Sequence, residues 1–150
     1  MKNNFLSIYT SKPYNKPEVT DKKFVTKDEF IDLFLNIDWS LGTAGTYPNY
    51  PYWPMPKNQL FLFDIKNQRS ISFDIIVCND WSYEFKLYHG IYQLKDSIYH
   101  GNIEIMETSC YDEYEMVGYI NDFFDRTYIS IKKLKEESGV YYNYKKTFSI

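Results

Sequence analysis

The spacing of apolar residues changes along this chain, and that change constrains the fold more than any other sequence feature. In residues 70–78, Ile71, Phe73, Ile75 and Val77 recur at every second position. Because successive side chains of a strand point to opposite faces, this period predicts a strand with one buried face. Earlier in the chain the period is that of a helix, so helical and strand-forming blocks are separate. Separate blocks are typical of the α+β class.

Residues 26–37 carry the clearest helical signal. Thr26 and Glu29 match a capping box, in which each side chain satisfies a backbone N–H at the start of the helix. The apolar residues spaced for one buried face are Phe30, Leu33, Phe34 and Ile37. The sequence therefore predicts a helix over 26–37.

Further segments after residue 59 have the composition or the period of strands. The predicted strands are 60–65, 70–78, 81–89, 91–94 and 102–107, followed by a last strand within 139–150. Short connections between them favour an antiparallel meander. The tripeptide Tyr-His-Gly occurs twice, at 88–90 and 99–101, and we interpret the two copies as similar turns.

A second helix is predicted to begin at Ser109. Its expected buried stripe is Tyr114, Val117, Ile120 and Phe124. The helical spacing of apolar residues continues towards Gly139, and an interruption is expected near Thr127. The β-branched residues in 127–131 also fit the start of a strand. We favour the helix. With 150 residues, the chain is predicted to form a single domain, 1–150. We expect a single antiparallel β-sheet of about 5–7 strands, in a meander of hairpins, with two helices packed on it.

The stretch TYPNYPYWP, residues 46–54 of a long loop at 38–59, places an aromatic residue before a proline at every third position. A polyproline II helix has three residues per turn, so Tyr47, Tyr50 and Trp53 would share one edge. These rings form either a recognition surface or a cap on the core. We favour the cap, because apolar loops rarely project into water; both interpretations hold if some rings stay exposed.

No nucleotide-binding, zinc-protease or serine-hydrolase motif is present in the sequence, and no catalytic residue, metal or cofactor is predicted. Cys110 is the strongest reactive candidate, because a thiol in the first turn of a helix has a lowered pKa. Neighbouring acids would oppose its ionisation, so we favour a buried, unreactive thiol. His89 and His100 lack the spacing of a recognised metal site.

Charge is unevenly distributed along the chain. Between Ser97 and Asp125 the sequence contains seven acidic residues and no lysine or arginine. On the second helix these acids are expected to face water, either as a solvated face or as a contact surface for a basic protein partner. The predicted partner-binding residues are Asp112, Glu113, Glu115, Asp122, Tyr111, Tyr119, Trp53 and Tyr50. Direct binding of nucleic acid is not expected, because the phosphates would be repelled.

These features favour a small protein-binding module, with an immunity protein that neutralises a basic, nuclease-like toxin domain as the specific hypothesis. A cytoplasmic location is expected, since the two cysteines form no CxxC motif and the sequence shows no apolar leader or membrane span. The alternative is an enzyme or small-ligand-binding protein. Its aromatic pocket would lie under the 43–56 loop, with Cys110 or a histidine as the reactive group.

Overall fold

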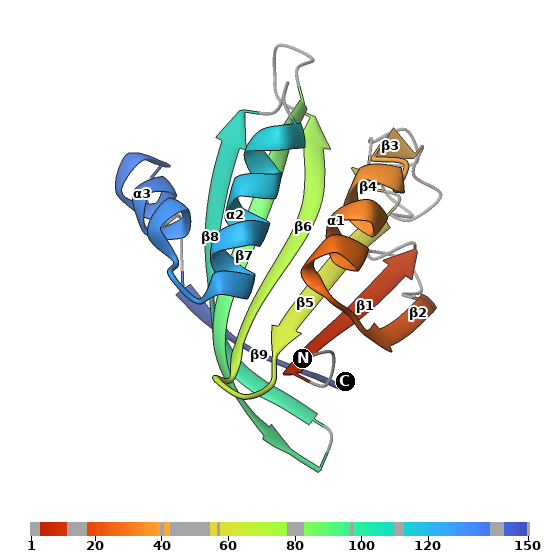
Figure 1. Cartoon of the computed structure of the whole chain (residues 1–150), viewed down its shortest axis with the longest axis vertical. Helices are drawn as coiled ribbons and strands as arrows, with labels where there is room; N and C mark the ends of the chain where they lie inside the picture. Colours follow the sequence, from red (N-terminus) through yellow and green to blue (C-terminus); the bar gives the residue numbers. More distant parts are fainter. Residues whose placement is uncertain are drawn as a thin grey trace, which may run out of the picture.

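The computed structural model has the predicted α+β architecture, with helices packed on one face of an antiparallel sheet (Figure 1). The residues that it describes are 4–11, 18–39, 41–42, 55–56, 58–77, 83–96, 98–109, 113–138 and 143–149. Within these ranges the main sheet has seven strands, as expected, but there are three helices instead of two.

The strands of the main sheet are β1 (Phe5–Ser11), β2 (Glu18–Phe24), β5 (Asn58–Asp64), β6 (Arg69–Val77), β7 (Tyr83–Lys95), β8 (Ile98–Ser109) and β9 (Asn143–Ser149). Their order is β2-β1-β5-β6-β7-β8-β9, and all neighbours are antiparallel. The segments expected as two strands at 81–89 and 91–94 form one continuous strand, β7. A short ladder of β3 (Leu41–Gly42) with β4 (Met55–Pro56) lies in the region expected to be a loop.

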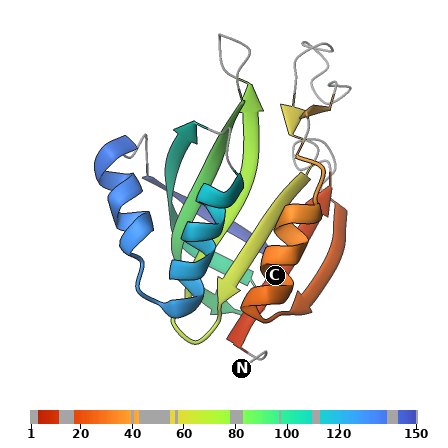
Figure 2. The same cartoon turned by 45° about the horizontal axis from the view of Figure 1, so that its top comes forward.

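The helices are α1 (Lys27–Asn36), α2 (Glu113–Asp125) and α3 (Ile129–Ser138). Figure 1 shows α1 and α2 lying antiparallel in front of the sheet, with α3 beside α2, past the edge of β8. The tilted view in Figure 2 shows the same order of helices. An ion pair between Lys27 Nζ and Asp125 Oδ1, 3.4 Å apart, joins the start of α1 to the end of α2.

The helical face of the sheet holds the larger core. The predicted cap of α1 is confirmed, since the Glu29 N–H donates to Thr26 Oγ1 at 3.3 Å. Phe34 is fully buried, and its ring centre lies 5.2 Å from that of Phe73 on β6. After the helix, the Trp39 indole N–H donates to the Phe34 carbonyl at 2.8 Å. These contacts fix α1 against the middle of the sheet.

The opposite face of the sheet is also buried, over β1, β5 and the β7–β8 hairpin. Phe63, Tyr92 and Tyr99 pack there, and the rings of the two tyrosines stack with centres 5.0 Å apart. Gly90 and Gly101 leave room for them, because a Cβ on either glycine would come within 2.6 Å of the Tyr99 side chain. The two Tyr-His-Gly copies therefore lie within strands β7 and β8, and their interpretation as turns is wrong.

The end of α2 is formed by Arg126, which has a positive φ of 58°. The Thr127 N–H donates to the Asp122 carbonyl at 3.0 Å and the Arg126 N–H to the Phe123 carbonyl at 3.2 Å, the two bonds of a Schellman motif. The Arg126 Nε then donates to the buried Asp64 carboxylate at 2.7 Å. This ion pair offsets the strain of a non-glycine residue in the left-handed region. The chain thus breaks between α2 and α3 where an interruption was expected.

Candidate functional site

α2 is rotated about its axis relative to the sequence prediction. Its buried residues are Met116, Tyr119, Ile120 and Phe123. Tyr114, predicted to be buried, is 76% exposed, whereas Tyr119 is 6% exposed. Burial raises the pKa of Tyr119 to about 12. Both stripes have helical spacing, and packing on the sheet selects the one that contains Met116 and Phe123. The expectation that Tyr119 faces a partner is therefore wrong.

Asp122 connects α2 to α3, although it was expected to face water. Its carboxylate accepts hydrogen bonds from the Ser130 N–H and, at 2.8 Å, from the Thr127 hydroxyl. Partial burial favours the protonated form, but these hydrogen bonds lower the pKa of Asp122 below its usual value. The Asp122 carboxylate therefore has its hydrogen-bond partners within the junction between α2 and α3.

Four other predicted contact residues lie outside the described residues: Tyr50, Trp53, Tyr111 and Asp112.

Exposed acidic and apolar side chains cover the outward face of α1 and α2. We name this surface the acidic helical face, and its residues are Asp28, Asp32, Leu35, Glu113, Tyr114, Glu115 and Asp125. Asp125 is paired with Lys27 across the two helices. None of its other acids forms an ion pair with a described residue. The surface therefore combines local negative charge with an exposed aromatic ring.

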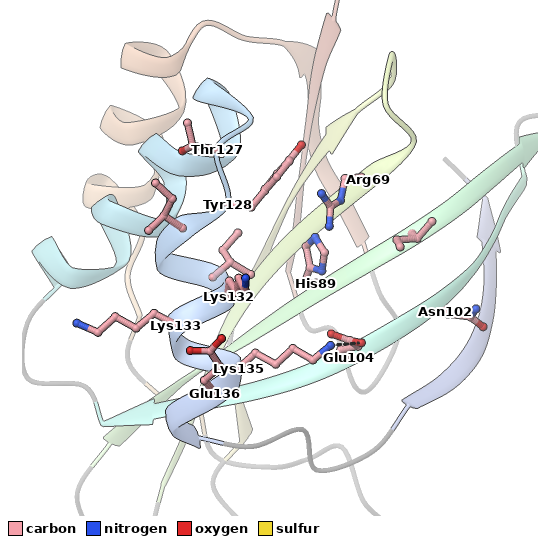
Figure 3. Close-up of a pocket in the computed structure, with 13 residues that line it drawn as sticks. Arg69, His89, Asn102, Glu104, Thr127, Tyr128, Lys132, Lys133, Lys135 and Glu136 are labelled. Atoms are coloured by element: carbon pink, nitrogen blue, oxygen red, sulfur yellow. Dashed lines mark hydrogen bonds and ion pairs between the residues drawn. The ribbon is translucent and has the colours of Figure 1, made fainter.

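A groove of about 1060 Å³ lies between α3 and the sheet (Figure 3). Its floor is made of cross-strand neighbours in two rows: Arg69, Ile91 and Asn102 in one, His89 and Glu104 in the other. Its wall is made of Tyr128 and residues of α3, among them three lysines, Lys132, Lys133 and Lys135. We name this site the α3 groove. The sheet face that is apolar under α1 and α2 becomes polar here.

His89 is the most deeply buried ionisable group of the α3 groove, with 7% of its surface exposed. Burial, together with the charges of Arg69 and Lys135, lowers the pKa of His89 to about 4, so the ring is neutral at pH 7. Glu104 faces His89 from β8, but its carboxylate accepts a hydrogen bond from Lys135 Nζ at 2.9 Å. The Arg69 guanidinium lies over the Tyr128 ring, 4.0 Å from its centre.

The two histidines do not form a common site. His89 pairs with Glu104 and His100 pairs with Gln93, so the two positions are four residues, or about 13 Å, apart along β8. In the part of the chain that the structure describes, no group of three or more His, Cys, Asp or Glu side chains could hold a metal ion. Cys110 and the aromatic residues expected to line a pocket under the 43–56 loop lie outside the described ranges.

The α3 groove was not identified from the sequence. Arg69 continues the alternating series of Ile71 and Phe73 on β6, and His89 continues that of Phe85 and Leu87 on β7. The strand period therefore predicts that both side chains lie on the face of the sheet that the helices cover. That signal was available, but neither residue is unusual on its own. The strand register and the break before α3 bring the two side chains into one groove.

No protein-family model, curated protein or solved structure matches this chain. Among the described helices, none is long and apolar enough to cross a membrane. The acidic helical face and the α3 groove are therefore the features of the described residues that point to a function.

Proposed function

We propose that this protein is a cytoplasmic protein-binding module of the immunity type, which neutralises a basic, nuclease-like toxin domain. The observation that carries this proposal is the 76% exposure of Tyr114 in the first turn of α2, where its neighbours in the sequence, Glu113 and Glu115, are also exposed. A tyrosine offers a large apolar ring and a hydroxyl that hydrogen-bonds at its tip. Such side chains are enriched among the few residues that supply most of the binding energy of an interface.

The acids around Tyr114 favour a basic partner. Asp28 and Asp32 extend the negative surface from α2 onto α1. A nuclease binds the phosphates of its substrate with cationic side chains, so carboxylates presented on a rigid helical layer can occupy the same cationic sites. Complementary charge also speeds association and disfavours partners of the same sign. In this proposal Tyr114 takes the role first assigned to Tyr119.

The proposal predicts that a toxin domain is encoded next to this chain's gene, and coexpression with that domain tests it, with bacterial growth as the readout. Coexpression of the wild-type chain should restore growth. The double variant Asp32→Lys/Glu115→Lys should not, because two reversed charges repel a basic partner. Both positions are exposed, so circular dichroism should show an unchanged fold.

The matched control is Asp21→Lys/Glu137→Lys, which makes the same change in net charge away from the acidic helical face. It should restore growth as the wild type does. Equal rescue by both double variants would contradict this face as the contact surface. Failure of the wild-type chain to restore growth would contradict the immunity function itself.

A further inference from the structure

Three buried polar atoms of residues that line the α3 groove have no hydrogen-bond partner among the described residues: the Tyr128 hydroxyl oxygen and, on the sheet, Arg69 Nε and His89 Nε2. Figure 3 shows the Arg69 and His89 side chains projecting from the sheet towards α3. Buried donors and acceptors are nearly always paired in folded proteins, because an unpaired one loses its hydration without compensation. Two such atoms side by side in one groove therefore indicate a ligand that hydrogen-bonds to both.

The α3 groove carries an excess of positive charge. Four of its lining residues are arginine or lysine and two are glutamate, and one of these, Glu104, is already paired with Lys135. Arg69 forms no ion pair with a described carboxylate, because its cross-strand neighbour Asp64 binds Arg126 instead. The guanidinium thus keeps its charge available to the groove. A negatively charged group would be stabilised there.

The α3 groove also has exposed apolar side chains. Ile91 on β7 and Ile129 on α3 are 61% and 69% exposed, on the two sides of the groove. The Tyr128 ring lies between the helix and Arg69. A volume of about 1060 Å³ is at the upper end of the range for small-molecule sites. The groove therefore fits a small molecule that has both a charged and an apolar part.

We propose that the α3 groove binds a small organic oxyanion, with its carboxylate or phosphate group at Arg69 and His89 and its apolar body against Ile91 and Ile129. The guanidinium donates from Nε, and a neutral imidazole donates from Nε2 in the tautomer protonated there. This site is separate from the acidic helical face and has the opposite charge, so it does not depend on the proposed immunity function.

Nuclear magnetic resonance titrations of the full chain with benzoate, phenyl phosphate and neutral benzamide test this proposal. An oxyanion should shift the resonances of the His89 ring and the Arg69 Nε–H until they saturate, and benzamide at the same concentration should not. Saturation with benzoate alone identifies a carboxylate site, and saturation with phenyl phosphate alone identifies a phosphate site. Absence of saturable shifts with both anions, or equal shifts with benzamide, would overturn the proposal.

Variants locate the site. Arg69→Gln should weaken the affinity for the saturating anion at least tenfold, because it removes a charge-assisted hydrogen bond. Lys132→Gln changes an exposed residue on the groove wall, leaves the fold intact, and should weaken the affinity about threefold through the lost charge. The matched control Lys22→Gln removes one exposed charge from β2 and should have no effect. Equal effects of Lys132→Gln and Lys22→Gln would overturn the groove as the site.

Discussion

Replacing His89 with glutamine should make the stability of this protein less sensitive to acid. In the folded chain, burial and the charges of Arg69 and Lys135 lower the pKa of His89 to about 4, from 6.5 for an unperturbed histidine. Between these values the unfolded chain binds a proton at His89 that the folded chain does not bind. The contribution of this group to stability is therefore complete above the unfolded pKa and is lost as the pH falls towards 4.

Between the two pKa values, the contribution of His89 to the free energy of unfolding changes by about 1.4 kcal/mol per pH unit. From pH 8 to pH 5, the contribution of His89 to the free energy of unfolding should fall by about 2 kcal/mol. Because glutamine does not titrate, the stability of the wild type relative to His89→Gln should fall by that amount over the same range. Urea denaturation at a series of pH values, followed by circular dichroism, measures this difference.

His100→Gln is the matched control, since it changes the exposed histidine, and it should follow the wild type. Carboxylates elsewhere in the chain titrate in the wild type and in both variants, so they cancel in the comparison. A difference between wild type and His89→Gln that stays constant from pH 8 to pH 5 would refute the burial of a neutral His89 in the α3 groove.

Three further substitutions test the packing by urea denaturation. Arg126→Met should lower the free energy of unfolding by about 3 kcal/mol, because it leaves the buried Asp64 carboxylate without its cation. A loss below about 1 kcal/mol would mean that this ion pair does not anchor the α2–α3 junction. Gly101→Ala should cost about 2 kcal/mol, because the new Cβ would lie 2.6 Å from Tyr99 Cζ, and an unchanged stability would contradict that close packing. Gly118→Ala should add about 0.5–1 kcal/mol, since Gly118 is exposed within α2 and nothing lies within 4 Å of the new Cβ; a loss of stability would argue against a regular helix there.

The first helix and the central strands could be predicted because their signals are local. Thr26 and Glu29 mark the start of α1 within four residues, and Phe30 and Phe34 mark its buried face. The first strand of the sheet was not assigned. Both faces of β1 are buried, because Phe5 packs in the core under the helices and Leu6 and Ile8 pack in the core on the opposite face. Its residues therefore do not alternate between apolar and polar.

The orientation of α2 could not be predicted, because its sequence supports two overlapping stripes. Tyr114 and Val117 belong to one stripe and Met116 and Tyr119 to the other, and Ile120 fits both. Only contact with the sheet decides between them. The end of α2 could not be predicted for a different reason. Arg126 occupies the position where a glycine is usual, and it is held there by Asp64, which lies 62 positions earlier in the chain.

The α3 groove depends on contacts that no local pattern contains. Arg69, His89 and Glu104 come from three strands, and they meet because the register of β6, β7 and β8 places them in adjacent rows.

The acidic helical face was predictable in part. The run of acids on α2 was evident from the sequence, but the exposed tyrosine among them is Tyr114, and the acids of α1 join only through the antiparallel packing of the two helices.

The affinity of the purified toxin domain for the wild-type chain and for Tyr114→Ala, measured by isothermal titration calorimetry, tests the central claim most directly. The wild type should bind with one-to-one stoichiometry. Loss of an exposed aromatic anchor should cost about 2 kcal/mol or more, or about 30-fold in affinity, while circular dichroism shows the fold unchanged. An equal affinity for Tyr114→Ala, or no binding by the wild type, would contradict the acidic helical face as the surface that neutralises a toxin.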